Sequence, residues 1–165
     1  MTNLKNLWIY NTAYRSFDWG DIAFDQQILH VQRNPVQTGK PDGTGKTSKV
    51  TGGGKAGGKE LYLIPGLIDI HMHIESSMTT PSEFSNAVLP HGTTTIVADC
   101  HEVANVFGVE GLESYMDLPS LVDVFHSIPS SVPSTSLTLE TSGGSIDAPE
   151  VERLCIRKDV IALGE

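Results

Sequence analysis

The chain has 165 residues, enough for a domain with a hydrophobic core, and 39% of them are hydrophobic. Its formal net charge of −9 argues against nucleic acid or an anionic membrane as the main partner. No apolar stretch approaches the roughly 20 residues that a membrane helix needs. The two cysteines, Cys100 and Cys155, lack the spacing of a disulfide framework. We therefore expect a cytoplasmic protein.

The first 60 residues are predicted to form a small β segment. Apolar runs at residues 7–10, 22–24 and 28–31 are separated by polar turns, as is typical of short strands. Residues 38–59 are rich in glycine and lysine and contain no apolar residue larger than Val50. That composition predicts a flexible loop or linker.

From residue 61 onward, strand-like and helix-like segments alternate. The strands begin roughly 30 residues apart, as in successive βα units. They are predicted over residues 67–74, 93–99, 122–127 and 160–164. A run of such units forms a parallel sheet whose functional sites lie at the carboxyl ends of the strands.

Helix start signals lie between the predicted strands. Residues 80–83 (Thr-Pro-Ser-Glu) combine a capping box with proline at the first helical position, and residues 147–150 repeat the device. Residues 91–92 are expected to close the first helix. Apolar spacing predicts a middle helix over residues 109–116. The alternation of elements predicts an α/β fold.

Two histidines mark the first strand of this region. Side chains two residues apart on a strand point to the same face, so His71 and His73 project together and can bind one divalent ion. The intervening apolar side chains are expected to fill the opposite face; they are Ile68, Ile70, Met72 and Ile74. The alternative is a pair of histidines on a half-exposed strand with no ligand.

Several blocks in order then resemble a known family. Residues 65–75 (PGLIDIHMHIE) carry a pattern typical of the amidohydrolase superfamily. The blocks IESSM and TPSEF, followed by LPHGTTTIVAD and HEVANV, narrow the resemblance to the adenine deaminases within it. The resemblance is strong over residues 61–165 and faint over residues 1–60.

The resemblance implies a fold and a metal centre. Members of this family have a metal-dependent (β/α)8 barrel, so residues 61–165 would be the first half of it, a partial barrel of about four βα units. Residues 1–60 would be the N-terminal β segment of a small composite domain. The family also implies a binuclear divalent metal centre, with manganese or iron expected and zinc possible. His71 and His73 would bind one metal, and Glu165 would bridge both. The alternative for Glu165 is an exposed residue with no such role.

His101 and Glu102 follow the second predicted strand and are expected to hang over the site on a loop. In the family such residues would act catalytically, orienting the substrate or holding an additional ion. The alternative is a hydrogen-bonded pair that shapes the turn. The implied reaction is hydrolysis of adenine to hypoxanthine and ammonia, as in purine salvage, with a metal lowering the pKa of water toward about 7.

The family takes two more histidine ligands and a catalytic aspartate from later barrel strands, beyond Glu165. We therefore expect the chain to be a fragment with negligible activity on its own, and a full-length form that could be a homo-oligomer. One alternative is a catalytically inactive remnant. Another is an amidohydrolase that acts on a different cyclic amide, which the blocks at residues 74–78 and 89–99 disfavour.

Overall fold

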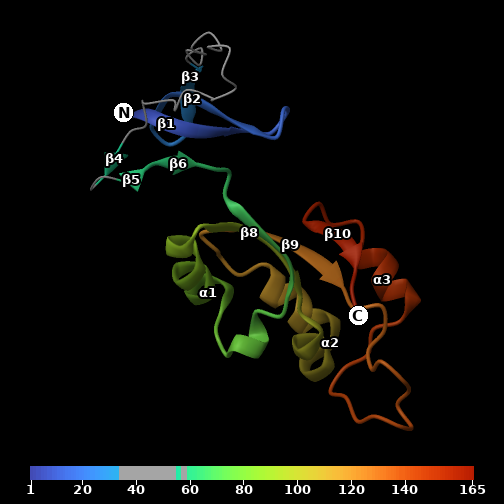
Figure 1. The fold of residues 1–165 in the computed structure, drawn as a ribbon. Coiled ribbons are helices and arrows are strands. Elements are labelled where there is room, and N and C mark those ends of the chain that lie inside the picture. Colours follow the sequence, from blue (N-terminus) through green and yellow to red (C-terminus); the bar gives the residue numbers. More distant parts are fainter. Residues whose placement is uncertain (34–54, 57–58) are drawn as a thin grey trace, which may run out of the picture. The chain divides into compact units, whose positions relative to one another are not determined.

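The structure, a computed structural model, describes residues 1–33, 55–56 and 59–165 (Figure 1). These residues form two compact units, Met1–Pro65 and Gly66–Glu165, called unit 1 and unit 2 below. None of the helices in this described part of the chain is long and apolar enough to cross a membrane.

Unit 1 contains a four-stranded sheet in the order β3-β2-β1-β6. Its strands are β1 (Thr2–Asn11), β2 (Ser16–Phe24), β3 (Ile28–Arg33) and β6 (Tyr62–Leu63). The first three pair antiparallel, and β6 runs parallel to β1. Each predicted apolar run lies in one of the first three strands, which confirms the strand predictions. The strands extend beyond the runs because backbone pairing continues through polar residues on either side of them.

Unit 1 buries a small core. Leu7, Ile9 and Ile22 are buried, and Phe24, Val31 and Leu63 pack against them. Aromatic rings add cross-strand contacts, including an edge-to-face pair of Trp8 and Trp19 whose ring centroids lie 5.3 Å apart. Both tryptophans of the chain therefore lie in this unit.

Most of the loop predicted over residues 38–59 lies outside the described residues. Its end is partly strand, because β4 (Lys55–Ala56) pairs antiparallel with β5 (Lys59–Glu60). The loop prediction is therefore wrong for residues 55–56 and 59.

Unit 2 contains a four-stranded sheet in the order β10-β9-β8-β7, in which every neighbouring pair is parallel. The strands are β7 (Leu67–Met72), β8 (Thr93–Asp99), β9 (Asp123–Ile128) and β10 (Val160–Leu163). Because consecutive parallel strands need a crossover, a helical segment follows each of the first three (Figure 1). The α/β class with a parallel sheet is confirmed.

Two of the three helices begin as the sequence predicts. In α1 (Pro81–Val88), the Thr80 side chain accepts a hydrogen bond from the Glu83 backbone at 3.3 Å. In α3 (Ala148–Leu154), Asp147 and Glu150 form a capping box. Two short 3-10 helices, η1 (Glu75–Ser77) and η2 (Leu89–His91), lie on either side of α1, and Gly92 ends η2 with a positive φ of 97°.

Helix α2 (His101–Met116) differs from the prediction, which began it at residue 109. Gly108 has φ 66° and ψ −158°, which are not helical values, so it interrupts the helix. The interruption breaks the regular spacing of apolar residues, and that spacing therefore predicts only the turns after Gly108. His101 and Glu102 consequently lie on the first turn of α2. The expectation that they belong to a loop was wrong.

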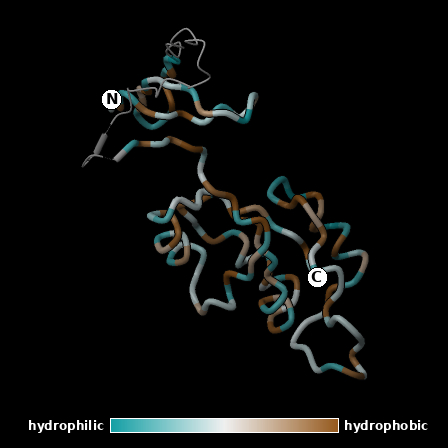
Figure 2. The backbone as a smooth tube through the Cα atoms, in the orientation of Figure 1, coloured by the Kyte–Doolittle hydropathy of each residue, from teal (hydrophilic) through white to brown (hydrophobic). Residues whose placement is uncertain are grey.

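The core of unit 2 lies between its sheet and helices, and Figure 2 shows hydrophobic residues recurring along these strands. It comprises Ile74, Ile96, Ala98, Cys100, Ala104, Leu112, Met116, Val122, Ile128, Val132, Ile146 and Leu154. Ile68 and Ile70 were expected to fill one face of β7, yet they are 61% and 78% exposed. In this chain β7 is the last strand of its sheet and pairs only with β8, whereas Ile74 from the same predicted set is buried in the core.

Candidate metal centre

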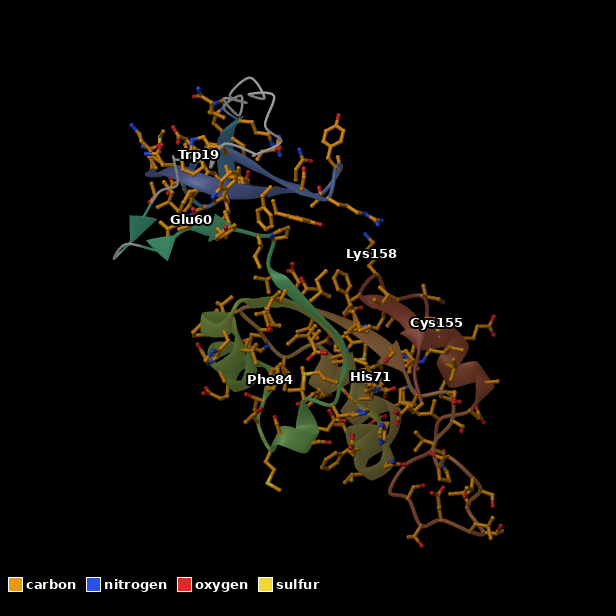
Figure 3. The ribbon with its side chains drawn as sticks, viewed as in Figure 1. Trp19, Glu60, His71, Phe84, Cys155 and Lys158 are labelled. Atoms are coloured by element: carbon orange, nitrogen blue, oxygen red, sulfur yellow. The ribbon has the colours of Figure 1, made fainter. Side chains whose placement is uncertain are left out.

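All the predicted site residues meet at the carboxyl ends of the unit 2 strands. His71 lies on β7, where Figure 3 labels it, and His73 directly follows that strand. His101 and Glu102 open α2 directly after β8, and Glu165 follows β10. Parallel strands bring these positions to one edge of the sheet, although up to 94 positions of chain separate them (165 − 71).

His71, His73 and Glu165 form a possible metal-binding group. The two imidazole centroids lie 4.9 Å apart, and His71 Nε2 lies 3.4 Å from Glu165 Oε1. One ligand atom from each residue lies within 4.8 Å of the other two. Nitrogen and oxygen ligands sit about 2.0–2.2 Å from a bound zinc ion, so atoms that share one ion lie at most about 4.4 Å apart. The group therefore needs little adjustment to close around a divalent cation.

The ring of His73 is oriented by the backbone. Its Nδ1 lies 2.6 Å from the carbonyl oxygen of Asp99. Because a carbonyl only accepts, Nδ1 carries the proton and Nε2 keeps a lone pair for a metal. Burial alone would lower the pKa of His73. The hydrogen bond to the Asp99 carbonyl and the nearby carboxylates of Glu102, Asp99 and Glu165 outweigh it and raise that pKa.

A second group of possible ligands shares His73 with the first. It consists of His73, His101 and Glu102, again with one ligand atom from each within 4.8 Å of the others. The rings of His73 and His101 lie 4.7 Å apart, and His101 Nε2 is 3.7 Å from Glu102 Oε1. His101 and Glu102 therefore face the same space as the histidine pair, within reach of an ion or a small substrate there.

Two carboxyl groups meet beside this second group. The Glu102 backbone donates to Glu75 Oε1 at 3.3 Å, and the Ser76 hydroxyl donates to Glu102 Oε1 at 2.6 Å. Burial, together with the neighbouring Glu102 carboxyl group, raises the pKa of Glu75 to about 7. Burial would also raise the pKa of Glu102, but the neighbouring Glu75 carboxyl group and the Ser76 hydroxyl prevail and lower it. Glu102 is thus anionic at neutral pH.

Asp99 also belongs to this region, although no pattern considered in the sequence singles it out. Its side chain is fully buried at the end of β8, and Oδ2 accepts a hydrogen bond from the Glu165 backbone at 2.8 Å. The available signal was an acidic residue closing the apolar run of β8 directly before the His101–Glu102 region.

The remaining histidines of the chain belong to neither group of possible ligands in the described residues. His126 is only 3% exposed, and burial lowers its pKa. The charged groups that also affect this pKa are Asp159, Arg157 and Asp117. His30 and His91 are exposed.

Comparison with known proteins places these observations in a family. The sequence model of the amidohydrolase family matches residues 62–162, which contain all of β7, β8 and β9 and most of β10. The chain belongs to the amidohydrolase family.

Curated relatives point to one branch of that family. Over 163 residues the chain is 48% identical to the adenine deaminase of a Clostridium perfringens strain, covering 98% of this chain and 27% of that protein. It is 42% identical over 166 residues to adenine deaminase 2 of Shouchella clausii, with 99% and 27% covered. A shorter match to adenine deaminase 2 of Oenococcus oeni reaches 58% identity over 107 residues, with 65% and 19% covered. The chain thus spans about a quarter of the length of the relatives it matches throughout.

Proposed function

We propose that the protein containing this chain hydrolyses adenine to hypoxanthine and ammonia at a divalent metal centre. The observation that carries the proposal is the meeting of His71, His73 and Glu165 at one sheet edge, in a chain whose relatives are named adenine deaminases. The parallel sheet of unit 2 would be the first four strands of a (β/α)8 barrel. Residues 1–60 would belong to a small β domain.

The donor set fits the implied metal. Two imidazole nitrogens and a carboxylate oxygen suit manganese, iron or zinc, and the family expectation is manganese or iron in a binuclear centre. His71 and His73 would hold one ion, and Glu165 would bridge to a second. A divalent ion at this position lowers the pKa of water from 15.7 toward about 7, which supplies a nucleophile at neutral pH.

His101 and Glu102 are proposed to act on the substrate. Among the described residues, Glu102 Oε2 and His101 Nδ1 are buried without a hydrogen-bond partner. Adenine offers N–H donors at its amino group and ring, and an anionic carboxylate accepts such donors. Glu102 would therefore orient the purine while water adds to C6. The hydroxyl of water adds to C6 and the other water proton goes to the ring nitrogen N1. The C6–N bond then breaks as the amino group takes the hydroxyl proton and leaves as ammonia, which yields the C6 carbonyl of hypoxanthine.

The test uses the longest form of the protein that its source cells make, purified and loaded with Mn²⁺. We expect ammonia release from adenine, loss of that release in His71→Ala, and retention in His30→Ala, which alters a histidine of unit 1. A metal-loaded protein that releases no ammonia from adenine would contradict the proposal. Hydrolysis of a cyclic amide such as dihydroorotate in its place would favour another branch of the amidohydrolases.

A further inference from the structure

We propose that Asp99 is a positioning residue of the metal centre, which holds Glu165 and His101 in place relative to His73. The inference rests on the proposed metal site and deepens it. It assigns no contact between Asp99 and the metal or the substrate. Asp99 joins three segments that carry the site, two through its buried side chain and one through its backbone carbonyl.

The first observation is the burial of a carboxyl group. Asp99 is 0% exposed, and it ends β8 next to Ala98 and Cys100, which are also buried. A polar side chain in such surroundings is costly to bury unless it is hydrogen-bonded. The groups that contact the oxygen atoms of Asp99 therefore indicate its structural role.

One carboxylate oxygen fixes the segment that carries Glu165. Asp99 Oδ2 accepts from the Glu165 backbone at 2.8 Å, across 66 positions of the chain. The same segment donates from Gly164 to the Ile128 carbonyl at 2.7 Å and accepts from the Ser130 backbone at 2.8 Å. These three bonds hold the backbone from which the Glu165 side chain reaches His71.

Gly164 permits this contact. A Cβ atom at position 164 would overlap Asp99 Oδ2, so any larger residue would push the carboxylate and the chain apart. The glycine thus serves the approach of the Asp99 carboxylate to the backbone after β10.

The second carboxylate oxygen faces His101. Asp99 Oδ1 lies 3.7 Å from His101 Nδ1, and neither atom has a hydrogen-bond partner in the described part of the chain. Glu165 Oε2 lies 3.9 Å from the same nitrogen, but the Glu165 side chain is 62% exposed and can be hydrated. The buried Asp99 oxygen is nearer, and a buried acceptor gains more from closing on a buried donor. A carboxylate that accepts a hydrogen bond from Nδ1–H fixes the orientation of the ring and leaves Nε2 free, as carboxylates do for histidines around metal sites.

The backbone carbonyl of Asp99 orients the third segment, which carries His73. The Asp99 carbonyl accepts from His73 Nδ1 at 2.6 Å. A substitution of the Asp99 side chain leaves this carbonyl in place. The experiment can therefore separate the loss of Glu165 and His101 positioning from the loss of the His73 orientation.

The experiment compares three variants of the longest natural form of the protein. Asp99→Asn keeps one carbonyl oxygen for the Glu165 backbone but replaces the oxygen that faces His101 with an amide nitrogen, and Asp99→Ala removes both oxygens. Ser85→Ala is the matched control, because Ser85 is also 0% exposed and its hydroxyl accepts from the Leu121 backbone at 3.0 Å, away from the site. Circular dichroism checks folding, and the readouts are the Kd for Mn²⁺ and the visible absorption spectrum with Co²⁺.

We expect Asp99→Asn to weaken Mn²⁺ binding about 10-fold and Asp99→Ala up to about 100-fold, the range for residues that orient metal ligands. Both variants should shift the Co²⁺ spectrum, which a loss of stability alone would not do. Ser85→Ala should lower the unfolding midpoint and leave the Kd and the spectrum unchanged.

Other outcomes separate this inference from the proposed function. A folded Asp99→Asn protein with the wild-type Kd and spectrum overturns the positioning role alone. A wild-type protein that binds Mn²⁺ but leaves adenine intact overturns the proposed reaction alone. A wild-type protein that binds no Mn²⁺ overturns both.

Discussion

The two units of this protein are both built on four-stranded sheets, yet among the described residues only unit 2 brings possible metal ligands together. Unit 1 pairs three of its strands antiparallel, so successive strand ends alternate between the two edges of the sheet. Unit 2 pairs its strands in parallel, so all four carboxyl ends meet at one edge. Histidine, glutamate and aspartate residues from distant parts of the sequence meet there. The direction of the strands therefore explains why the possible ligands gather in unit 2.

The largest effect is expected from removing the two histidines of β7. Replacing both His71 and His73 with alanine should reduce Mn²⁺ affinity by at least about 100-fold, because two of the three ligands in the first group are lost. The matched control is His30→Ala in unit 1, which should leave the affinity unchanged. Isothermal titration with Mn²⁺ measures both. Equal affinities in the two variants would place the metal elsewhere.

The second prediction concerns the two cores. Ile96→Ala removes a fully buried side chain of unit 2 and should reduce the free energy of unfolding by about 2–5 kcal/mol. Ile22→Ala, in the smaller core of unit 1, should cost less because more of its surroundings can relax.

Each unit has its own spectroscopic reporter for that test. Both tryptophans lie in unit 1, and the helices of the described residues lie in unit 2. Ile96→Ala should therefore lower the midpoint of the helical circular dichroism transition, and Ile22→Ala that of tryptophan fluorescence. Identical shifts of both signals by either variant would show that the units do not unfold separately.

A pair of glycines offers a sharper comparison. A Cβ at Gly164 would overlap the Asp99 carboxylate, and a Cβ at Gly20 would overlap the Gln32 backbone oxygen. Gly164→Ala should weaken Mn²⁺ binding about 10-fold by displacing Glu165. Gly20→Ala should lower the fluorescence midpoint and leave Mn²⁺ binding intact. The reverse assignment of effects would break the contrast between the units.

The smallest effect is a pH dependence confined to unit 2. Burial lowers the pKa of His126, while Asp159 and Asp117 oppose the shift and Arg157 adds to it. As the pH falls, His126 gains its proton at about pH 6.5 in the unfolded protein and only at a lower pH in the folded protein. The stabilisation from a neutral His126 is therefore present above about pH 6.5 and is lost as the pH falls through the folded pKa.

Circular dichroism melts between pH 7.5 and 5.5 measure this loss. In His126→Gln the midpoint should fall less across that range than in the wild type. An equally steep fall in the variant would assign the pH dependence to other groups.

Much of the site follows from local patterns in the sequence. The spacing of His71 and His73 places both on one face of a strand, and capping residues mark α1 and α3. Strand alternation and helix capping each depend on residues a few positions apart, so both can be recognised in a single sequence. The same holds for the βα spacing that predicts a parallel sheet.

What the sequence could not provide depends on long-range contacts or on a local irregularity. Asp99 meets the Glu165 backbone across 66 positions, and no local pattern encodes that pairing. Gly108 interrupts α2 and conceals its first turns, which misplaced His101 and Glu102 on a loop. Ile70 is exposed although it lies in an apolar run, because burial depends on which elements cover a strand and not on the run alone.

The central claim is that His71, His73 and Glu165 share one divalent ion. Anomalous diffraction from crystals grown with Mn²⁺ tests it most directly. We expect an anomalous peak within about 2.0–2.3 Å of one ligand atom from each of the three residues. Bound Mn²⁺ whose peak lies away from these side chains, or no peak among them at saturating Mn²⁺, would contradict it.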